Sequence, residues 1–415
     1  MKHPLIRLAA SLPLATLAAC QGLGSDDGST LDLEGQLTGR DPRLDAVLSD
    51  RETYRAQVSI AEVVPDGEGS FHLRREFLGD PNVYFYPASS IKTAAAVVAL
   101  LWLNRVNDEV QPRSSIGFGL DTELTYRALF DDEVDEDRDE SHLDGGRITV
   151  GHELRKLSIV SDNLAYNRFY ELVGQERLDQ YLERAGFPGF HLVHRLSEFR
   201  SPEDNRRLPA IQLRGPLPGR TLNLEERTTA PLPTPPEMPG LDTGRAFMRG
   251  GERVDEPFDF RAKNRVPLVE LQDFLVELVR PEVDTGRPGF PGLTIDQRAF
   301  LLEAMAELPA DSTDPVYDPE RYPDDFVKFL LPGLREVRDD GRWRIYNKVG
   351  LAYGFTVENA YVEDSTTGRG LFVAATLYTN PNEVLNDGVY GYDELAFPFY
   401  AGLGKLVGEW LVGEQ

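Results

Sequence analysis

Cysteine and histidine are scarce in this sequence, which limits the chemistry that it can support. One cysteine, Cys20, occurs among 415 residues, so no disulfide can form within the chain. Six histidines and this cysteine give no convincing zinc cluster, and we expect neither a metal nor another cofactor. Positively charged residues are also fewer than negatively charged ones, with 44 Lys and Arg against 69 Asp and Glu. The resulting net charge of −25 argues against a nucleic-acid partner.

Long apolar runs are missing too, and none is long and uncharged enough to span a bilayer. Residues 1–19 have a basic start, a short apolar run and small residues, which is the pattern of a secretory signal. The sequence "LAAC", ending at Cys20, resembles the bacterial lipoprotein cleavage box. That resemblance implies a lipidated Cys20 and an exported protein, anchored to the bacterial cell envelope only through its lipid and facing the periplasm or the cell surface. A plain signal peptide with an incidental cysteine is the alternative.

The remaining composition predicts one large folded domain, since 41% of residues are hydrophobic and 10% are aromatic. We expect a flexible tether over 20–43 and a single domain over 44–412. Alternating patterns predict a hairpin with strands near 55–63 and 70–77, and "WRIYNKVG", "FTVENAYVED" and "GLFVAATLYTN" predict three late strands. Helical patterns fill the middle, and an apolar helix closes the chain.

These patterns predict an α+β fold, in which the N- and C-terminal strands share one antiparallel sheet flanked by helices. The α/β part covers about 44–88 and 335–412, and an inserted helical part covers about 89–334. Within the helical part, residues 202–240 are proline-rich and are expected to be irregular. This insert suits a lid, a substrate-specificity element or a decorated loop.

An acidic run, "FDDEVDEDRDESHLDGG", hints at calcium because Asp135, Asp137 and Asp139 alternate. The calcium-loop template fails, however, since Glu140 occupies the glycine position of the turn and Gly146 the last ligand position. We therefore expect a solvated acidic loop.

Two polar residues precede an alanine-rich helix in "YFYPASSIKTAAAVVALLWLN", which spans 84–104. Serine needs a base to become a nucleophile. A lysine can be that base when burial makes its ammonium group lose its proton. Ser89 and Lys92 are three apart and share a helix face, whereas Ser90 and Lys92 do not. The pair therefore suggests a nucleophile and its base at a helix N-terminus. An N-capping serine beside an exposed lysine is the alternative.

Two further motifs follow in order: Ser161-Asp162-Asn163 at a helical junction and Lys348-Val349-Gly350 on a late strand. Ser-x-x-Lys, Ser-Asp-Asn and Lys-Thr-Gly are the motif set of serine β-lactamases and penicillin-binding proteins. The sequence resembles that family over about 44–411, and most closely in "YPASSIKTAAAVVALL" and "LSIVSDNLAYNRFYELVG". The resemblance implies the α+β fold of these enzymes and a site that needs no cofactor.

The resemblance also implies catalytic roles. Ser89 would be acylated, Lys92 would take its proton, and Ser161 would relay a proton to the leaving group. Lys348 would add positive charge, lowering the pKa of Lys92 and attracting an anionic substrate.

Substrate-binding roles follow from the same resemblance. Asn163 would orient Lys92 and a substrate amide, and Gly350 would let the strand edge approach the substrate. The backbone N–H groups of Ser89 and Leu351 would form the oxyanion hole.

Two features depart from the family pattern. Val349 replaces the usual Thr or Ser, whose hydroxyl binds a substrate carboxylate, at a cost of about 1–3 kcal/mol. The glutamate that class A β-lactamases use for deacylation would correspond to Glu198, but Pro202 stands where an asparagine is expected and Glu203 competes. A surface glutamate is the alternative for both Glu198 and Glu203.

We therefore expect a monomeric, exported β-lactamase-like serine hydrolase that acts on a β-lactam, a cell-wall peptide or another ester or amide. Its partner would be a small-molecule or peptidoglycan-like substrate. A non-catalytic envelope protein for binding or sensing on the same fold is the alternative, and a lipoprotein with coincidental motifs is a third.

Overall fold

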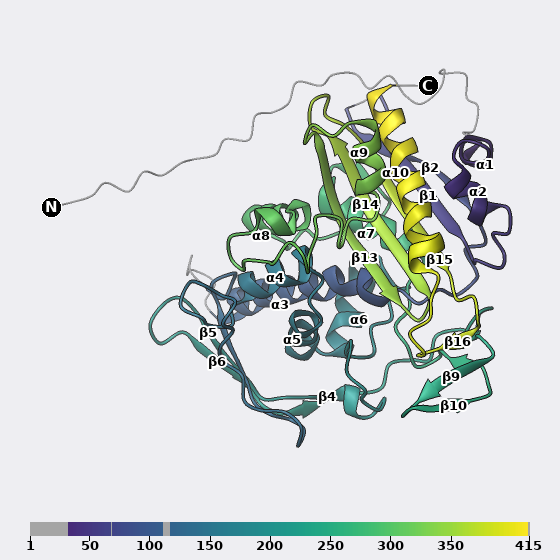
Figure 1. The fold of residues 1–415 in the computed structure, drawn as a ribbon. Helices are drawn as coiled ribbons and strands as arrows, with labels where there is room; N and C mark the ends of the chain where they lie inside the picture. Colours follow the sequence, from purple (N-terminus) through teal and green to yellow (C-terminus); the bar gives the residue numbers. More distant parts are fainter. Residues whose placement is uncertain (1–31, 68, 111–116, 414–415) are drawn as a thin grey trace.

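A six-stranded sheet forms the centre of the domain in the computed structural model, which describes residues 32–67, 69–110 and 117–413 (Figure 1). Its strand order is β12-β2-β1-β15-β14-β13. The strands are Val283–Asp284 (β12), Phe71–Leu78 (β2), Gln57–Pro65 (β1), Arg369–Tyr378 (β15), Phe355–Asp364 (β14) and Trp343–Ala352 (β13). Neighbours are antiparallel except for β12, which is parallel to β2. Because β1 pairs with β15, strands from both ends of the domain share one sheet, and the predicted α+β fold is confirmed.

One face of the sheet is covered by helices from the two ends of the chain (Figure 1). They are α1 (Leu33–Leu37), α2 (Pro42–Leu48), α9 (Leu331–Val337) and the yellow α10 (Phe397–Val412). Alternate residues of β15, such as Val373 and Ala375, point into this core. Phe372 and Ala374 point to the opposite core, which is the two-sided burial expected of a central strand.

The other core is built by the middle of the chain. Its helices are α3 (Lys92–Val110), α4 (Val150–Ile159), α5 (Asn163–Val173), α6 (Gln175–Arg184), α7 (Leu268–Val279) and α8 (Ile295–Ala306). The alanine-rich start of α3 is buried on all sides, as its uncharged sequence predicts. Thr149 and Asp162 cap α4 and α5, and their side-chain oxygens accept backbone N–H groups of the first turns.

Two predictions about the outer segments need correction. The domain begins before residue 44, because Asp32 caps α1 and the apolar side chains of Leu33 and Leu37 are buried against the sheet. The proline-rich region is also more regular than predicted. Its strands β5 (Ile211–Arg214) and β6 (Thr221–Leu224) join β3 (Glu123–Tyr126) in a small sheet, because short alternating stretches lie between the prolines.

Further short strands pair within the helical part: β4 (Arg207–Leu208) with β7 (Arg227–Thr228), β8 (Asp242–Thr243) with β11 (Phe258–Asp259), and β9 (Ala246–Arg249) with β10 (Glu252–Val254). β9 also pairs with β16 (Val384–Leu385), which comes from the C-terminal α/β part. The predicted signal segment and the lipidation site at Cys20 lie outside the described residues. Among the residues that are described, no helix has the length and apolar character to cross a membrane.

Candidate active site

Ser89 lies in a short 3-10 turn, Ala88–Ile91, that runs directly into α3. The backbone N–H of Lys92 donates to the carbonyl oxygen of Ser89, so the two side chains are one turn apart. Ser90 is buried, and its hydroxyl donates to the carbonyl oxygen of Pro87 at 2.8 Å. Ser89 is half-buried and lines two cavities. The environment of the two serines therefore supports Ser89 as the nucleophile.

Lys92 is fully buried, and its amine is held by two oxygens that can only accept hydrogen bonds. Its Nζ donates to the carbonyl oxygen of Ser161 at 2.5 Å and to Oδ1 of Asn163 at 2.6 Å. Burial, and next the nearby charge of Lys348, lowers the pKa of Lys92 well below its usual value. A neutral amine has two N–H groups and one lone pair. When Lys92 is neutral, these two oxygens accept from both N–H groups, and the lone pair is left to accept a proton.

Ser161 lies between α4 and α5 in a left-handed backbone conformation, with φ of +59°. This is an uncommon conformation for a residue with a side chain, and such residues gather at functional sites. The turn directs both oxygens of Ser161 toward Lys92, whose Nζ lies 3.3 Å from Oγ and 2.5 Å from the carbonyl oxygen. Asn163 opens α5 and donates from Nδ2 to the hydroxyl of Ser197 at 2.7 Å.

Lys348 approaches the same hydroxyl from the edge strand β13, and its Nζ donates to Ser161 Oγ at 2.6 Å. Burial lowers the pKa of Lys348 to about 7, against the opposing charge of Glu358. Gly350, two residues on, packs against the nucleophile turn so closely that a Cβ would collide with the carbonyl oxygen of Pro87. The structure thus brings the three motifs together around one hydroxyl group.

Two cavities meet at this cluster, and Ser89, Asn163 and Leu351 line both of them. The larger has a volume of about 1130 Å³, and its charged lining residues are Arg249, Lys263 and Asp387. The smaller has a volume of about 670 Å³ and is lined largely by apolar side chains: Val160, Tyr322, Pro323, Phe326, Val327, Phe329, Pro332, Val349 and Phe397. Leu351, the predicted second oxyanion donor, lies on β13.

Glu198 is not brought into the cluster, and the structure does not support its predicted catalytic role. Asn167 Nδ2 donates to Glu198 Oε1 at 2.6 Å, and Arg195 and Arg200 lie 3.8 Å and 3.5 Å from Oε2. These partners hold the carboxylate away from the two cavities. Its competitor, Glu203, is exposed at the start of a short turn.

Ser197 instead contacts Asn163 and lines the larger cavity, a role that the sequence analysis missed. Arg249 and Lys263 were missed as well. Ser197 and Lys263 lie in loops and Arg249 ends the short strand β9. None of these segments carries a motif, so no local signal could have identified the three residues.

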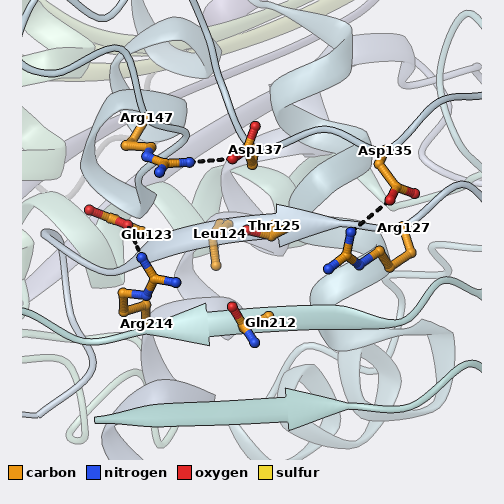
Figure 2. Close-up of a pocket in the computed structure, with 9 residues that line it drawn as sticks. All are labelled: Glu123, Leu124, Thr125, Arg127, Asp135, Asp137, Arg147, Gln212 and Arg214. Carbon is orange, nitrogen blue, oxygen red and sulfur yellow. Dashed lines mark hydrogen bonds and ion pairs between the residues drawn. The ribbon is translucent and has the colours of Figure 1, made fainter. Parts of the chain in front are cut away.

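The acidic loop is held by ion pairs, as Figure 2 shows around a surface pocket on β3 and β5. Asp135 pairs with Arg127 at 2.6 Å, and Asp137 pairs with Arg147. Because arginines already neutralise these carboxylates, the pocket does not suit calcium. Within the described chain, the groups that could hold a metal involve His152 and lie apart from the residues lining the two cavities.

Comparisons with known proteins agree with the motifs. Residues 68–229 match the model of the beta-lactamase enzyme family. None of the curated proteins matches the sequence. Among solved structures, a β-lactamase from Desulfarculus baarsii is similar at 15% identity and a TM-score of 0.46, over 92% of this chain and 98% of that one.

Two further solved structures show a similar degree of likeness. A β-lactamase from Streptosporangium roseum has 12% identity and a TM-score of 0.45, over 90% of this chain and 99% of that one. A β-lactamase from Burkholderia vietnamiensis has 15% identity and a TM-score of 0.44, over 91% and 98%.

The segment that matches the family model holds the first two motifs, and the third lies beside them in space. With the motifs in order and their side chains converging on Ser161, the chain resembles the beta-lactamase enzyme family, whose model residues 68–229 match.

Proposed function

We propose that the protein hydrolyses an amide or ester through an acyl-enzyme on Ser89. The observation that carries this proposal is the convergence of Lys92 and Lys348 on Ser161, on the wall of a cavity that Ser89 also lines. These groups supply the parts that acyl transfer by serine needs: a nucleophile, a buried neutral base and a proton relay.

In the first step, Ser89 Oγ attacks the substrate carbonyl and its proton passes to the lone pair of Lys92 Nζ. The tetrahedral intermediate then collapses, the bond to the leaving group breaks, and the leaving group takes a proton through the hydroxyl of Ser161. Lys348 stabilises this relay, since its amine already donates to Ser161 Oγ. Water then attacks the acyl-enzyme and releases the acid and free Ser89.

The oxyanion of the intermediate would be bound by the backbone N–H groups of Ser89 and Leu351. Gly350 supports this arrangement, because its lack of a side chain lets β13 pack against the turn that carries Ser89. Ser89 and Leu351 line both cavities, so the reacting carbonyl would lie where the cavities meet.

The smaller cavity suggests which substrates fit. Val349 lines it where the family usually has a hydroxyl, and its charged lining residues are the acidic Asp162 and Asp325. A substrate carboxylate placed there would lose a hydrogen bond and face negative charge. We therefore favour an ester or amide with an uncharged, apolar group on the side of Ser161 over a carboxylate-bearing β-lactam or cell-wall peptide.

Labelling with a fluorophosphonate probe tests the nucleophile. The wild type and Ser90→Ala should be labelled, and Ser89→Ala should not, with mass spectrometry locating the adduct on the peptide that contains residue 89. Circular dichroism verifies that each variant is folded. Equal labelling of wild type and Ser89→Ala would end the proposal.

A non-catalytic binding or sensing role on the same fold is the second candidate, and the missing hydroxyl at Val349 motivates it. Turnover of a chromogenic β-lactam or ester distinguishes the two. Turnover that disappears in Lys92→Ala excludes the binding role, whereas tight ligand binding without turnover in the wild type would favour it.

We also propose that the protein is exported and held at the bacterial cell envelope by a lipid on Cys20. The pattern of residues 1–20 supports this. Cell fractionation should find the full-length protein with membranes, and a Cys20→Ser variant should lose its lipid and that association.

A further inference from the structure

Two histidines and an aspartate from three separate segments meet near the first turn of α4, at the end of this helix away from Ser161. His152 lies in the first turn of α4, His142 in the loop before it, and Asp314 between α8 and α9. The imidazole rings stack with centroids 4.4 Å apart. His142 Nε2 and His152 Nδ1 each lie 3.7 Å from an oxygen of Asp314, too far for a hydrogen bond.

The hydrogen bonds on the opposite side of each ring fix the tautomer. His142 Nδ1 lies 2.6 Å from the carbonyl oxygen of Arg147, which can only accept, so the proton of the neutral ring is on Nδ1. The lone pair of His142 is therefore on Nε2, the nitrogen that faces Asp314.

The same reasoning applies to His152. The hydroxyl of Ser141 donates its one proton to Asp139 at 2.6 Å, and Lys156 holds that aspartate as a carboxylate. Ser141 Oγ can therefore only accept from His152 Nε2, 3.0 Å away, which leaves the lone pair on Nδ1. The side chain of His152 is 1% exposed, and among the described residues Nδ1 has no hydrogen-bond partner.

Both lone pairs thus face a carboxylate across a gap. Such an arrangement is repulsive while both imidazoles are neutral, and a proton on His142 Nε2 or a metal ion between the three groups relieves the repulsion. Metal–ligand bonds of about 2.0–2.1 Å place neighbouring ligands of a tetrahedral ion about 3.3–3.4 Å apart. The two distances of 3.7 Å, from His142 to Oδ2 and from His152 to Oδ1 of Asp314, are longer than this, so the side chains must draw together around an ion. The contacts to Arg147 and Ser141 are the outer hydrogen bonds that orient metal-bound imidazoles.

We propose that His142, His152 and Asp314 bind a zinc ion, with water as the fourth ligand. Two imidazole nitrogens and one carboxylate suit zinc, whereas calcium and magnesium prefer an all-oxygen set. The ion would enter from the surface, because Asp314 also lines an open cavity of about 490 Å³. This proposal departs from the expectation that the six histidines form no zinc cluster.

The neighbouring group of Asp139, Glu153 and His152 is a weaker candidate. Lys156 lies 2.6 Å from Asp139, and Arg168 lies 2.8 Å from Glu153, so cations already neutralise both carboxylates. Zinc at the proposed site would join the acidic loop, the start of α4 and the segment after α8. It would thereby brace the helix that ends next to the catalytic loop.

Zinc titration of the chelator-treated full-length chain tests the site, with stoichiometry from calorimetry and stability from thermal unfolding. The wild type should bind one zinc ion and gain several degrees in Tm. His142→Gln and Asp314→Asn should each lose at least tenfold in affinity and most of that gain. His72→Gln, an exposed histidine of β2, is the matched control and should behave like the wild type.

Asp314 is partly exposed, so Asp314→Asn serves if His142→Gln does not fold. Calcium in place of zinc should leave Tm unchanged. Zinc uptake by the wild type no greater than that of His142→Gln or Asp314→Asn would overturn the proposal, as would a Tm gain that both variants retain. Neither result depends on the reaction at Ser89.

Discussion

Lys348 Nζ donates a 2.6 Å hydrogen bond to Ser161 Oγ, although β13 and the α4–α5 loop are far apart in the chain. Lys92 Nζ lies 3.3 Å from the same oxygen. Two buried amines therefore share one hydroxyl group. Burial, and next the positive charge of Lys348, lowers the pKa of Lys92 well below its usual value.

Removing Lys348 should shift the pH profile of the reaction. Lys92 must be neutral to accept a proton, so kcat/KM rises with pH as Lys92 loses its charge. In Lys348→Met the repulsion is gone and the pKa of Lys92 rises. The acidic limb of the profile should therefore move to higher pH, in addition to any loss of rate.

The profile is measured with a neutral ester, so that the substrate does not titrate. Lys405→Met, a substitution on α10 away from the cluster, should leave the limb where it is. A limb that stays in place or moves to lower pH in Lys348→Met would contradict the electrostatic coupling of the two lysines.

Val349→Thr should restore recognition of a carboxylate. The substitution keeps the β-branched shape and adds the missing hydroxyl beside Ser89. A hydrogen bond to a carboxylate would contribute about 1–3 kcal/mol, or roughly 5- to 150-fold in acylation rate. The rates are compared for a penicillin and its methyl ester. Only the free acid should be acylated faster by the variant. An equal increase in acylation rate for both compounds would show that the new hydroxyl does not act through the carboxylate.

Glu198→Gln should leave hydrolysis of the acyl-enzyme nearly unchanged. Asn167, Arg195 and Arg200 hold this carboxylate away from the cavities. The new side-chain amide can still accept from Asn167, and Arg195 keeps its ion pair with Glu171, so the variant should stay folded. The decay of a labelled acyl-enzyme measures the step directly. If Glu198 were the general base, the substitution would slow hydrolysis of the acyl-enzyme by about 10²- to 10⁴-fold, and that result would support its predicted catalytic role.

The sequence predicted most of the central architecture because periodicity and local spacing encode it. The hairpin of β1 and β2, the buried start of α3 and the three late strands follow from alternation and unbroken apolar runs. The pairing of Ser89 with Lys92 follows from helix geometry alone. Their convergence with Ser161 and Lys348 was inferred from a family resemblance, since no local pattern encodes contacts across so many residues.

Contacts made by loops could not be predicted from the sequence. Glu198 and Ser197 are adjacent, and only the backbone conformation of the loop, with φ of +58° at Ser197, decides which one faces Asn163. The ring orientations of His142 and His152 likewise depend on tertiary hydrogen bonds. A count of histidines could not reveal them.

Gly350→Ala should disable the site and destabilise the fold, because the added methyl group has no room. Its Cβ would collide with the carbonyl oxygen of Pro87 and approach the backbone N of Ser90, so β13 or the nucleophile turn must move. Overpacking of this kind costs about 1–3 kcal/mol, measured as a fall in the free energy of unfolding. Since backbone rather than a flexible side chain blocks the methyl group, relaxation would displace Ser89 relative to Leu351, whose backbone N–H is the second proposed oxyanion donor.

The matched control is Gly119→Ala, where an added Cβ meets nothing within 4 Å and the backbone φ suits alanine. This control should retain both stability and labelling of Ser89 by the fluorophosphonate probe. In Gly350→Ala, labelling should fall by more than the change in folded fraction explains. A folded Gly350→Ala variant with wild-type labelling would show that close contact between β13 and the turn is not needed for acylation.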